Sequence, residues 1–150
     1  MSSYLTFYGI PRLESDDRND EIKEKVEDKD AKPISIVSFN RNNDIYRYFD
    51  ENCNIAYCYD SIKYSDITSS DVSVVESDIK NDIMSSEKRL HEYEKYAGSN
   101  PDYVQEILSI KEYLEDLYRA LHYAEFIGYI VSEAELKYRG GFTKIVANIG

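Results

Sequence analysis

The 150-residue sequence contains no tryptophan, only six glycines and only three prolines, so it offers few positions at which the chain turns sharply. Such a composition favours a small number of long elements over many short strands. No stretch approaches the ~20 apolar residues that a membrane-spanning helix needs, and the first residues lack the basic and apolar regions of a signal peptide. We therefore expect an intracellular protein that does not associate with a membrane.

The only two cysteines, Cys53 and Cys58, are too few for a disulfide scaffold, and their spacing matches neither a redox pair nor a common zinc pair. The sequence also lacks a glycine-rich phosphate loop, a Gly-x-Ser-x-Gly motif and a His-Glu-x-x-His motif. His91 and His122 fall on different predicted helices, roughly 22 Å apart, too far to share a metal within one chain. The sequence thus predicts no catalytic residue, no cofactor and no metal, and therefore not an enzyme.

Acidic residues outnumber basic ones, 29 against 18, and the net charge is −11 at pH 7. This charge argues against direct binding to nucleic acid or to an anionic membrane, and it is compatible with a basic protein partner. Charged residues are dense in residues 14–32, where Ile22 and Val26 are the only large apolar side chains. Such a segment cannot bury enough surface to offset its ordering, so we predict a mobile acidic loop.

Three segments near the N-terminus have the alternation and the β-branched or aromatic content of strands, namely residues 4–10, 34–39 and 55–59. Before the third, Asn42 or Asn43 caps a short helix, DIYRYFDEN, whose apolar residues cluster at helical spacing. We therefore predict a small three-stranded sheet with one short helix. It needs a cover, because so small a sheet is marginal alone.

Residues that begin and end helices define two long helices joined by a tight turn. Thr68 and Asp71 form a capping-box pattern at the start of the first helix. Gly98 stands where a left-handed helix terminator is favoured. Asn100 caps the second helix, and Pro101 occupies its first position. A connection this short forces the two helices to pack antiparallel.

Apolar residues recur at steps of three and four along both helices, which predicts one buried seam on each. The first seam contains Val72, Val75, Ile79, Ile83, Ser86, Leu90, Tyr93 and Ala97. The second contains Tyr103, Ile107, Ile110, Leu114, Leu117, Leu121, Ala124, Gly128 and Val131. Over residues 120–131 apolar side chains lie nearly all round the helix, which predicts burial against the small sheet. The second helix should overhang the first by about two turns.

Together these segments predict an α+β fold in one domain, 1–150: a small N-terminal three-stranded sheet with a short helix, packed on a long antiparallel two-helix hairpin. The head covers residues 1–64, including the acidic loop 14–32, and the hairpin covers 68–138. The remaining residues, 139–150, form a short, locally basic tail with an apolar face. We expect this tail to dock on the acidic body or on a second copy.

Large apolar side chains outside the seams are candidates for contact with a partner. The candidate interface consists of Tyr96, Tyr113, Tyr118, Tyr123 and Tyr129 on the helices, with Phe142 and Ile145 in the tail. One interpretation is that the tyrosines cover the sides of the hairpin and its junction with the head. The other is a protein interface, in which tyrosine supplies large, rigid contact area. A two-helix hairpin is thin for a stable element, so we also expect a homo-oligomer in a four-helix arrangement.

The phrases SFNRNNDIYRYFDEN and HEYEKYAGSNPDYVQEI resemble segments of small proteins from tailed bacteriophages of gut Bacteroides, the crAss-like group. The resemblance spans Tyr4 to about Tyr138, and the richness in Ile, Lys, Asn and Tyr fits an AT-rich genome. It implies a viral setting, in the host cytoplasm or in the virion. It brings no activity and no functional residue with it.

Two functions are compatible with these features. The first is a non-enzymatic phage interaction or structural accessory protein that acts through its helical hairpin and self-associates. The alternative is an acidic inhibitor that mimics nucleic acid and blocks a host nucleic-acid-binding defence protein. The interspersed lysines and arginines count against the alternative, because they interrupt a continuous negative surface.

Overall fold

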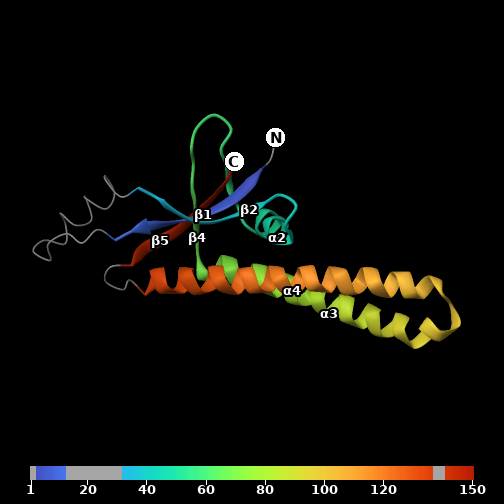
Figure 1. Ribbon diagram of the computed structural model, residues 1–150. Coiled ribbons are helices and arrows are strands. Elements are labelled where there is room, and N and C mark those ends of the chain that lie inside the picture. Colours follow the sequence, from blue (N-terminus) through green and yellow to red (C-terminus); the bar gives the residue numbers. More distant parts are fainter. Residues whose placement is uncertain (1–2, 13–31, 137–140) are drawn as a thin grey trace, which may run out of the picture.

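The computed structural model describes residues 3–12, 32–136 and 141–150. In chain order its elements are β1 (Tyr4–Pro11), β2 (Ile34–Asn40), α2 (Asp44–Asn52), β3 (Ala56–Tyr57), β4 (Ser65–Ile67), α3 (Ser69–Tyr96), the 3-10 turn η1 (Ala97–Ser99), α4 (Asp102–Glu135) and β5 (Phe142–Ile149). Figure 1 shows a sheet and α2 at one end, with α3 and α4 extending far beyond them. The predicted α+β class is confirmed. The acidic loop expected at 14–32 falls, apart from Lys32, outside the described residues.

The sheet has five strands, not the three predicted, and its middle strand comes from the C-terminus. β1 pairs antiparallel with β2 on one side and with β5 on the other. The far edge of β5 pairs in parallel with β3 and antiparallel with β4. The described part of the tail expected at 139–150 therefore docks on the body, with Phe142–Ile149 as a central strand. Its partners are distant in the sequence, so no local pattern indicated the pairing.

The strand expected at 55–59 is shorter than predicted, and a further strand follows it. Only Ala56–Tyr57 pair with β5, and the chain returns to the sheet at β4. Side-chain hydrogen bonds tie down the intervening loop: the Asn148 amide donates to the carbonyl oxygen of Lys63 at 3.0 Å, and the backbone N–H of Ala56 donates to the Ser65 hydroxyl at 2.8 Å. Asn148 can be buried because its amide finds this partner.

One face of the sheet forms a common core with the helices. Phe7 on β1 packs edge-to-face against Phe39, with ring centroids 6.2 Å apart, and against Phe49 of α2 at 5.0 Å. Asn43 caps α2, because its side chain accepts a hydrogen bond from the backbone N–H of Ile45 at 3.3 Å. Asn43 is therefore the capping residue of the two expected. This cap fixes where α2 begins and directs its apolar face onto the sheet.

Both ends of α3 and the start of α4 follow local signals, with one exception. The capping box is confirmed: Thr68 accepts from the backbone N–H of Asp71, and the Asp71 carboxylate accepts from that of Thr68. The Asn100 side chain likewise accepts from the backbone N–H of Asp102 at 3.0 Å. The left-handed terminator predicted at Gly98 is wrong. Gly98 lies in the 3-10 turn η1, without a positive φ, so the reversal needs no left-handed residue.

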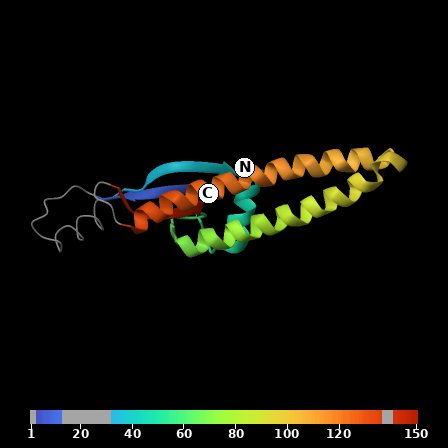
Figure 2. The same ribbon diagram turned by 90° about the horizontal axis from the view of Figure 1, so that it is seen from below.

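The predicted overhang of the second helix by about two turns is too long, since α4 extends only a little past the start of α3 at the sheet (Figure 1). The backbone N–H of Ser69, at the start of α3, donates to the Glu135 carboxylate at the end of α4, at 2.9 Å. The 3-10 turn adds rise to the first arm, which makes the two arms similar in length, about 48 and about 51 Å. Figure 2 shows the two helices running alongside each other and joined at the turn.

Burial along α4 differs from the prediction for residues 120–131. Ala120, Ala124, Ile127 and Val131 are buried as expected, but Phe126 and Tyr129 are 46% and 64% exposed. α3, α2 and β5 pack against α4, and they leave one long side of it open. An apolar residue on that side has nothing to bury it. None of the described helices combines the length and apolar character required to cross a membrane.

Candidate functional site

Five of the seven predicted interface residues lie on the two long helices, and four of them are exposed. Tyr96, Tyr113, Tyr118 and Tyr129 keep between 40% and 64% of their surface accessible. Tyr123 is half-buried, because its ring packs on Phe39 with centroids 4.8 Å apart. Tyr123 thus fastens the hairpin to the head, which was the first of the two interpretations. The other four are exposed.

The two candidate residues expected in the tail belong to the sheet, and the burial of Ile145 contradicts its assignment to an interface. Ile145 lies in β5 and is only 1% exposed. The ring of Phe142 lies over Gly9, where an added Cβ would come within 2.3 Å of it. The apolar face recognised at 139–150 is therefore a core face. A strand buried on both sides uses such residues for packing, not for a partner.

Several carboxylates near the head are engaged in holding α2 on α3. The hydroxyl of Tyr48, a fully buried residue, donates to the Asp82 carboxylate, and the Asn52 amide donates to Asp78 at 2.9 Å. Burial, and then the bond to Asp82, raise the pKa of Tyr48 well above its ordinary value. These acidic groups have structural partners and do not form a free negative surface.

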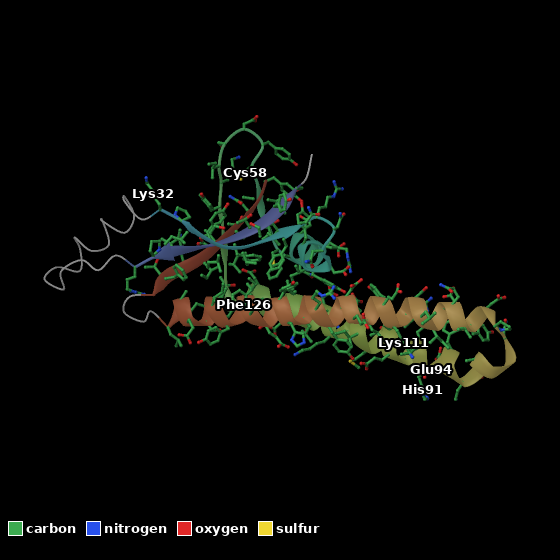
Figure 3. The ribbon with its side chains drawn as sticks, in the orientation of Figure 1. Lys32, Cys58, His91, Glu94, Lys111 and Phe126 are labelled. Atoms are coloured by element: carbon green, nitrogen blue, oxygen red, sulfur yellow. The ribbon has the colours of Figure 1, made fainter. Side chains whose placement is uncertain are left out.

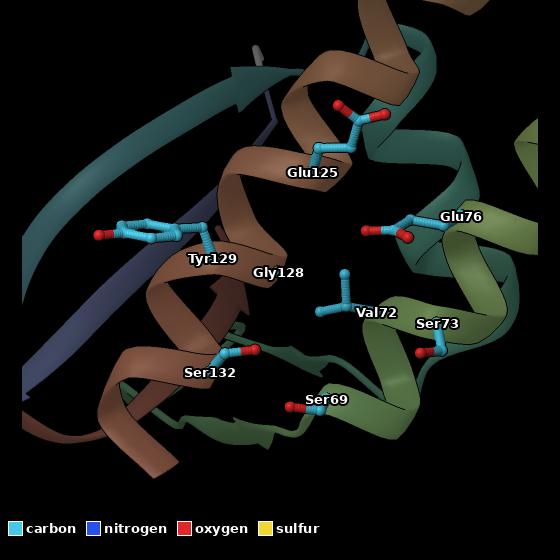
Figure 4. A pocket seen from close by; sticks show the side chains of 8 residues that line it. All are labelled: Ser69, Val72, Ser73, Glu76, Glu125, Gly128, Tyr129 and Ser132. Atoms are coloured by element: carbon cyan, nitrogen blue, oxygen red, sulfur yellow. The ribbon is translucent and has the colours of Figure 1, made fainter. Parts of the chain in front are cut away.

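A polar cleft of about 370 Å3 lies between α3 and α4 at the sheet end (Figure 4). Its walls carry hydroxyl groups and two carboxylates: Ser69, Val72, Ser73, Glu76, Glu125, Gly128, Tyr129 and Ser132. The helices come close here, since a Cβ on Gly128 would stand 3.1 Å from both Val72 and Glu76. Neither a histidine nor a cysteine lines the cleft. Across the described residues, no three His, Cys, Asp or Glu side chains are grouped to hold a metal ion.

A second cleft, of about 390 Å3, lies near the turn and is aromatic. Tyr93 and Tyr103 pack edge-to-face across the hairpin at 5.3 Å, and the Arg89 guanidinium lies 5.8 Å from the Tyr93 ring. Arg89 also pairs with Glu106 of the opposite helix at 3.6 Å. Glu92 and Tyr96 complete the lining. These contacts join the two helices near the turn. The residues that line the cleft therefore serve the packing of the hairpin and do not form a binding site.

The open side of α4 carries a line of exposed, large apolar side chains, which we call the outer stripe. It consists of Val104, Leu108, Tyr118, Phe126, Tyr129 and Leu136. At ~100° per residue all six fall within about 80° of one another around the helix. Figure 3 shows how far the stripe extends: Phe126 lies beside the sheet, and Lys111, between Leu108 and Tyr118, lies well toward the turn. On α3 the exposed large aliphatic residues are Val74 and Met84.

Sequence reasoning found Tyr118 and Tyr129 but missed the aliphatic members of the stripe and a second exposed patch. Tyr59 and Ile62, in the loop between β3 and β4, are 85% and 74% exposed. A second apolar periodicity on α4, half a turn from the seam, could have revealed the stripe. The loop residues carried no periodic signal that would have marked them.

The two histidines and the two cysteines do not form a common site. His91 and His122 are exposed on different helices, and the nearest ionic neighbour of His122 is Glu125 at 3.9 Å. Both cysteines are free and half-buried, and burial raises the pKa of the Cys53 thiol to about 11. A thiol with so high a pKa is a poor nucleophile at neutral pH.

No protein-family model matches the chain, and comparisons with the curated proteins and with the solved structures gave no match. The function must therefore be inferred from the residues themselves.

Proposed function

We propose that this protein is a non-enzymatic interaction factor that acts through the outer surface of its helical hairpin, in the setting of a bacteriophage infection. The observation that carries the proposal is the outer stripe of α4. Six large apolar side chains, each 41% to 64% exposed, stand in line along a helix of a chain whose net charge is −11. Aligned exposed apolar residues on an otherwise charged surface are typical of a protein–protein contact.

Apart from the hydrogen bond that the Tyr118 hydroxyl donates to Glu87 of α3, the stripe is independent of what holds the fold together. The seam residues of α4 lie on the opposite side of the helix, where Leu117 and Ala120 are fully buried. Its members could therefore be polar without loss of the core. Solvating apolar side chains is unfavourable, so their alignment supports a role in binding.

The phage setting rests on the resemblance of two segments to proteins of the crAss-like group. Mass spectrometry of purified virions tests it directly. A protein of the virion would be detected there in defined stoichiometry. A protein that acts only in the host cytoplasm would be found in infected cells and not in virions.

Mimicry of nucleic acid has less support than a hairpin interface. Acidic side chains such as Asp78 and Asp82 are bonded inside the fold, and basic residues are interleaved with the remainder, as in the Arg89–Glu106 pair. Mimicry predicts binding to a basic protein that weakens steeply as salt rises. An apolar contact predicts association that salt hardly changes.

Sedimentation of the full-length protein at low salt and at about 0.5 M salt separates these outcomes. We expect an association that persists at both, and that is lost when Phe126→Gln and Tyr129→Gln are combined. The matched control combines Val74→Gln with Met84→Gln, since these residues are equally exposed but lie on α3. A monomer under all conditions that is also absent from virions would refute the proposed function.

A further inference from the structure

The outer side of α4 has a symmetry that the apolar residues alone do not reveal. Around His122 the residues of this side form pairs at equal distances before and after it. The pairs are Tyr118 with Phe126, Glu115 with Tyr129, Lys111 with Glu133, and Leu108 with Leu136. All nine residues fall within about 80° around the helix, because their spacings of three and four follow its ~100° per residue. His122 stands in the middle of this arc.

We propose that this surface binds a second copy of the chain, with the two α4 helices antiparallel about a twofold axis at His122. The inference rests on the proposed function and names the partner of its surface. In an antiparallel pair, a residue before the axis faces the residue that lies equally far beyond it in the other copy. Any residue of a helix has neighbours at these spacings on its own side, so the chemistry of the four pairs decides whether the surface can be its own partner.

Three of the four pairs place like or complementary side chains face to face. Leu108 meets Leu136 of the second copy at both ends of the contact, and Tyr118 meets Phe126 nearer the axis. Lys111 of each copy meets Glu133 of the other, so the twofold symmetry gives two such charge pairs in the dimer. A different register would separate these three pairs, which favours His122 as the centre.

The net charge of the protein bears on whether two copies can form this contact. Two copies that each carry a net charge of −11 repel one another, so complementary charges in the contact favour this pairing. Arg119 and Glu125 stand three residues to either side of His122 and add a second complementary pair at the margin of the contact. Arg119 is now paired with Asp116 at 3.2 Å, an exposed contact that it can exchange without cost to the fold.

The surface is accessible along its length. The stripe members from Leu108 to Leu136 are 41% to 64% exposed, and in the described part of the chain α3, α2 and β5 pack on other sides of α4. The contact would extend over about 42 Å of helix. With α3 beside each α4, the dimer contains four helices, an arrangement that buries apolar surface which one hairpin leaves open.

A charge exchange at Lys111 and Glu133 tests the register. In sedimentation equilibrium of the full chain, Lys111→Glu and Glu133→Lys should each weaken the dimer by about tenfold or more, since each creates two like-charge contacts. The double variant should restore the dimer, because the pairs are re-formed with reversed sign. Lys88→Glu, which makes the same change on the exposed side of α3, should have no effect.

Spin-label distances give a second measurement that does not depend on the strength of a salt bridge. In a Cys53→Ala, Cys58→Ser background, labels at His122→Cys should lie within about 20 Å between copies, because the helix axes are close there. Labels at Gln105→Cys should lie about 50 Å apart, since this position is distant from the axis. A parallel dimer would give short distances at both positions.

The outcomes distinguish this inference from the proposed function. A dimer that ignores the charge exchange, or that gives short distances at both positions, overturns the antiparallel register while the proposed function stands. A monomer that is nevertheless incorporated in virions also overturns the antiparallel dimer and leaves the proposed function standing. A monomer absent from virions overturns both.

Discussion

The sheet end of the hairpin and its turn end use the same kind of seam but are packed differently. At the sheet end Val75, Ile79 and Leu117 are fully buried, because the sheet and α2 cover the two helices. At the turn end Leu90 and Ile107 are only half-buried, since each helix has little but the other helix to pack on. The contrast shows that a seam of constant spacing gives unequal stability along its length.

This contrast indicates what stabilises the part of the hairpin that extends beyond the sheet. The turn end has a short connection, a tyrosine pair and an ion pair, each worth little alone. The sheet end supplies most of the buried apolar surface. The turn end should therefore open locally at a lower free energy than the sheet end.

The largest effect is expected from truncating the seam at the sheet end. Leu117→Ala should lower the free energy of unfolding by about 3 kcal/mol or more, because a fully buried leucine leaves a cavity that the neighbouring elements cannot fill. Chemical denaturation monitored by circular dichroism at fixed protein concentration measures it.

The control is the same substitution at the turn end. Leu90→Ala should cost only about 1 kcal/mol, since the half-buried site can relax and admit water. Equal losses for Leu117→Ala and Leu90→Ala would mean that the two ends are packed alike, and the comparison would fail.

A smaller effect is expected at the contact of α2 with α3. Tyr48→Phe removes a buried hydroxyl and leaves Asp82 without this donor, which should cost about 1–2 kcal/mol. Tyr118→Phe removes a similar bond to Glu87 on the exposed part of the hairpin, and its effect should be much smaller. Thermal melts of the two variants provide the comparison.

The raised pKa of Tyr48 predicts that the stability of the fold depends on pH. The folded-state pKa of Tyr48 is raised by burial first and by the bond to Asp82 second, whereas the unfolded tyrosine has a pKa of about 10. Below pH ~10 the hydroxyl is protonated in both states, so its contribution is constant. Above that pH the unfolded state loses the proton first, and stability falls as pH rises. The fall should be shallower in Tyr48→Phe, and an unchanged slope would contradict this assignment.

The features that the sequence could predict are those that depend on neighbouring residues. Both seams, the capping box at Thr68 and the caps at Asn43 and Asn100 depend on neighbours within a few residues, and the structure confirms them. The exposed tyrosines Tyr118 and Tyr129 also follow from helical spacing. Local patterns of this kind fix an element and its faces before any tertiary contact forms.

What the sequence could not predict depends on contacts between distant segments. β5 pairs with β1 from the other end of the chain, so Ile145 was mistaken for part of an interface. Phe126 lies in an apolar stretch that predicted burial, yet no element covers its side of α4 in the described part of the chain. Both errors arise because periodicity identifies an apolar face without identifying what packs against it.

The helix start at the sheet end provides a further, smaller test. Thr68→Ala removes the side-chain acceptor for the backbone N–H of Asp71 and should cost about 1 kcal/mol. Ser70→Ala, in the exposed first turn of the same helix, changes no cap and should be nearly neutral. Denaturation midpoints measure both. If the two variants behave alike, the capping box does not stabilise α3.

The smallest effect is expected at the turn end, where Arg89 and Glu106 pair across the hairpin at 3.6 Å with about half of each side chain exposed. In a double-mutant cycle with Arg89→Gln and Glu106→Gln, the coupling energy should be below about 0.5 kcal/mol, because solvent screens an exposed pair. It should decrease further in about 1 M salt, where the Debye length is ~3 Å. Arg89 also lies by the Tyr93 ring, and that contact should remain, since it does not involve Glu106. A coupling above 1 kcal/mol that resists salt would show that polar contacts hold the turn end as firmly as apolar packing holds the sheet end.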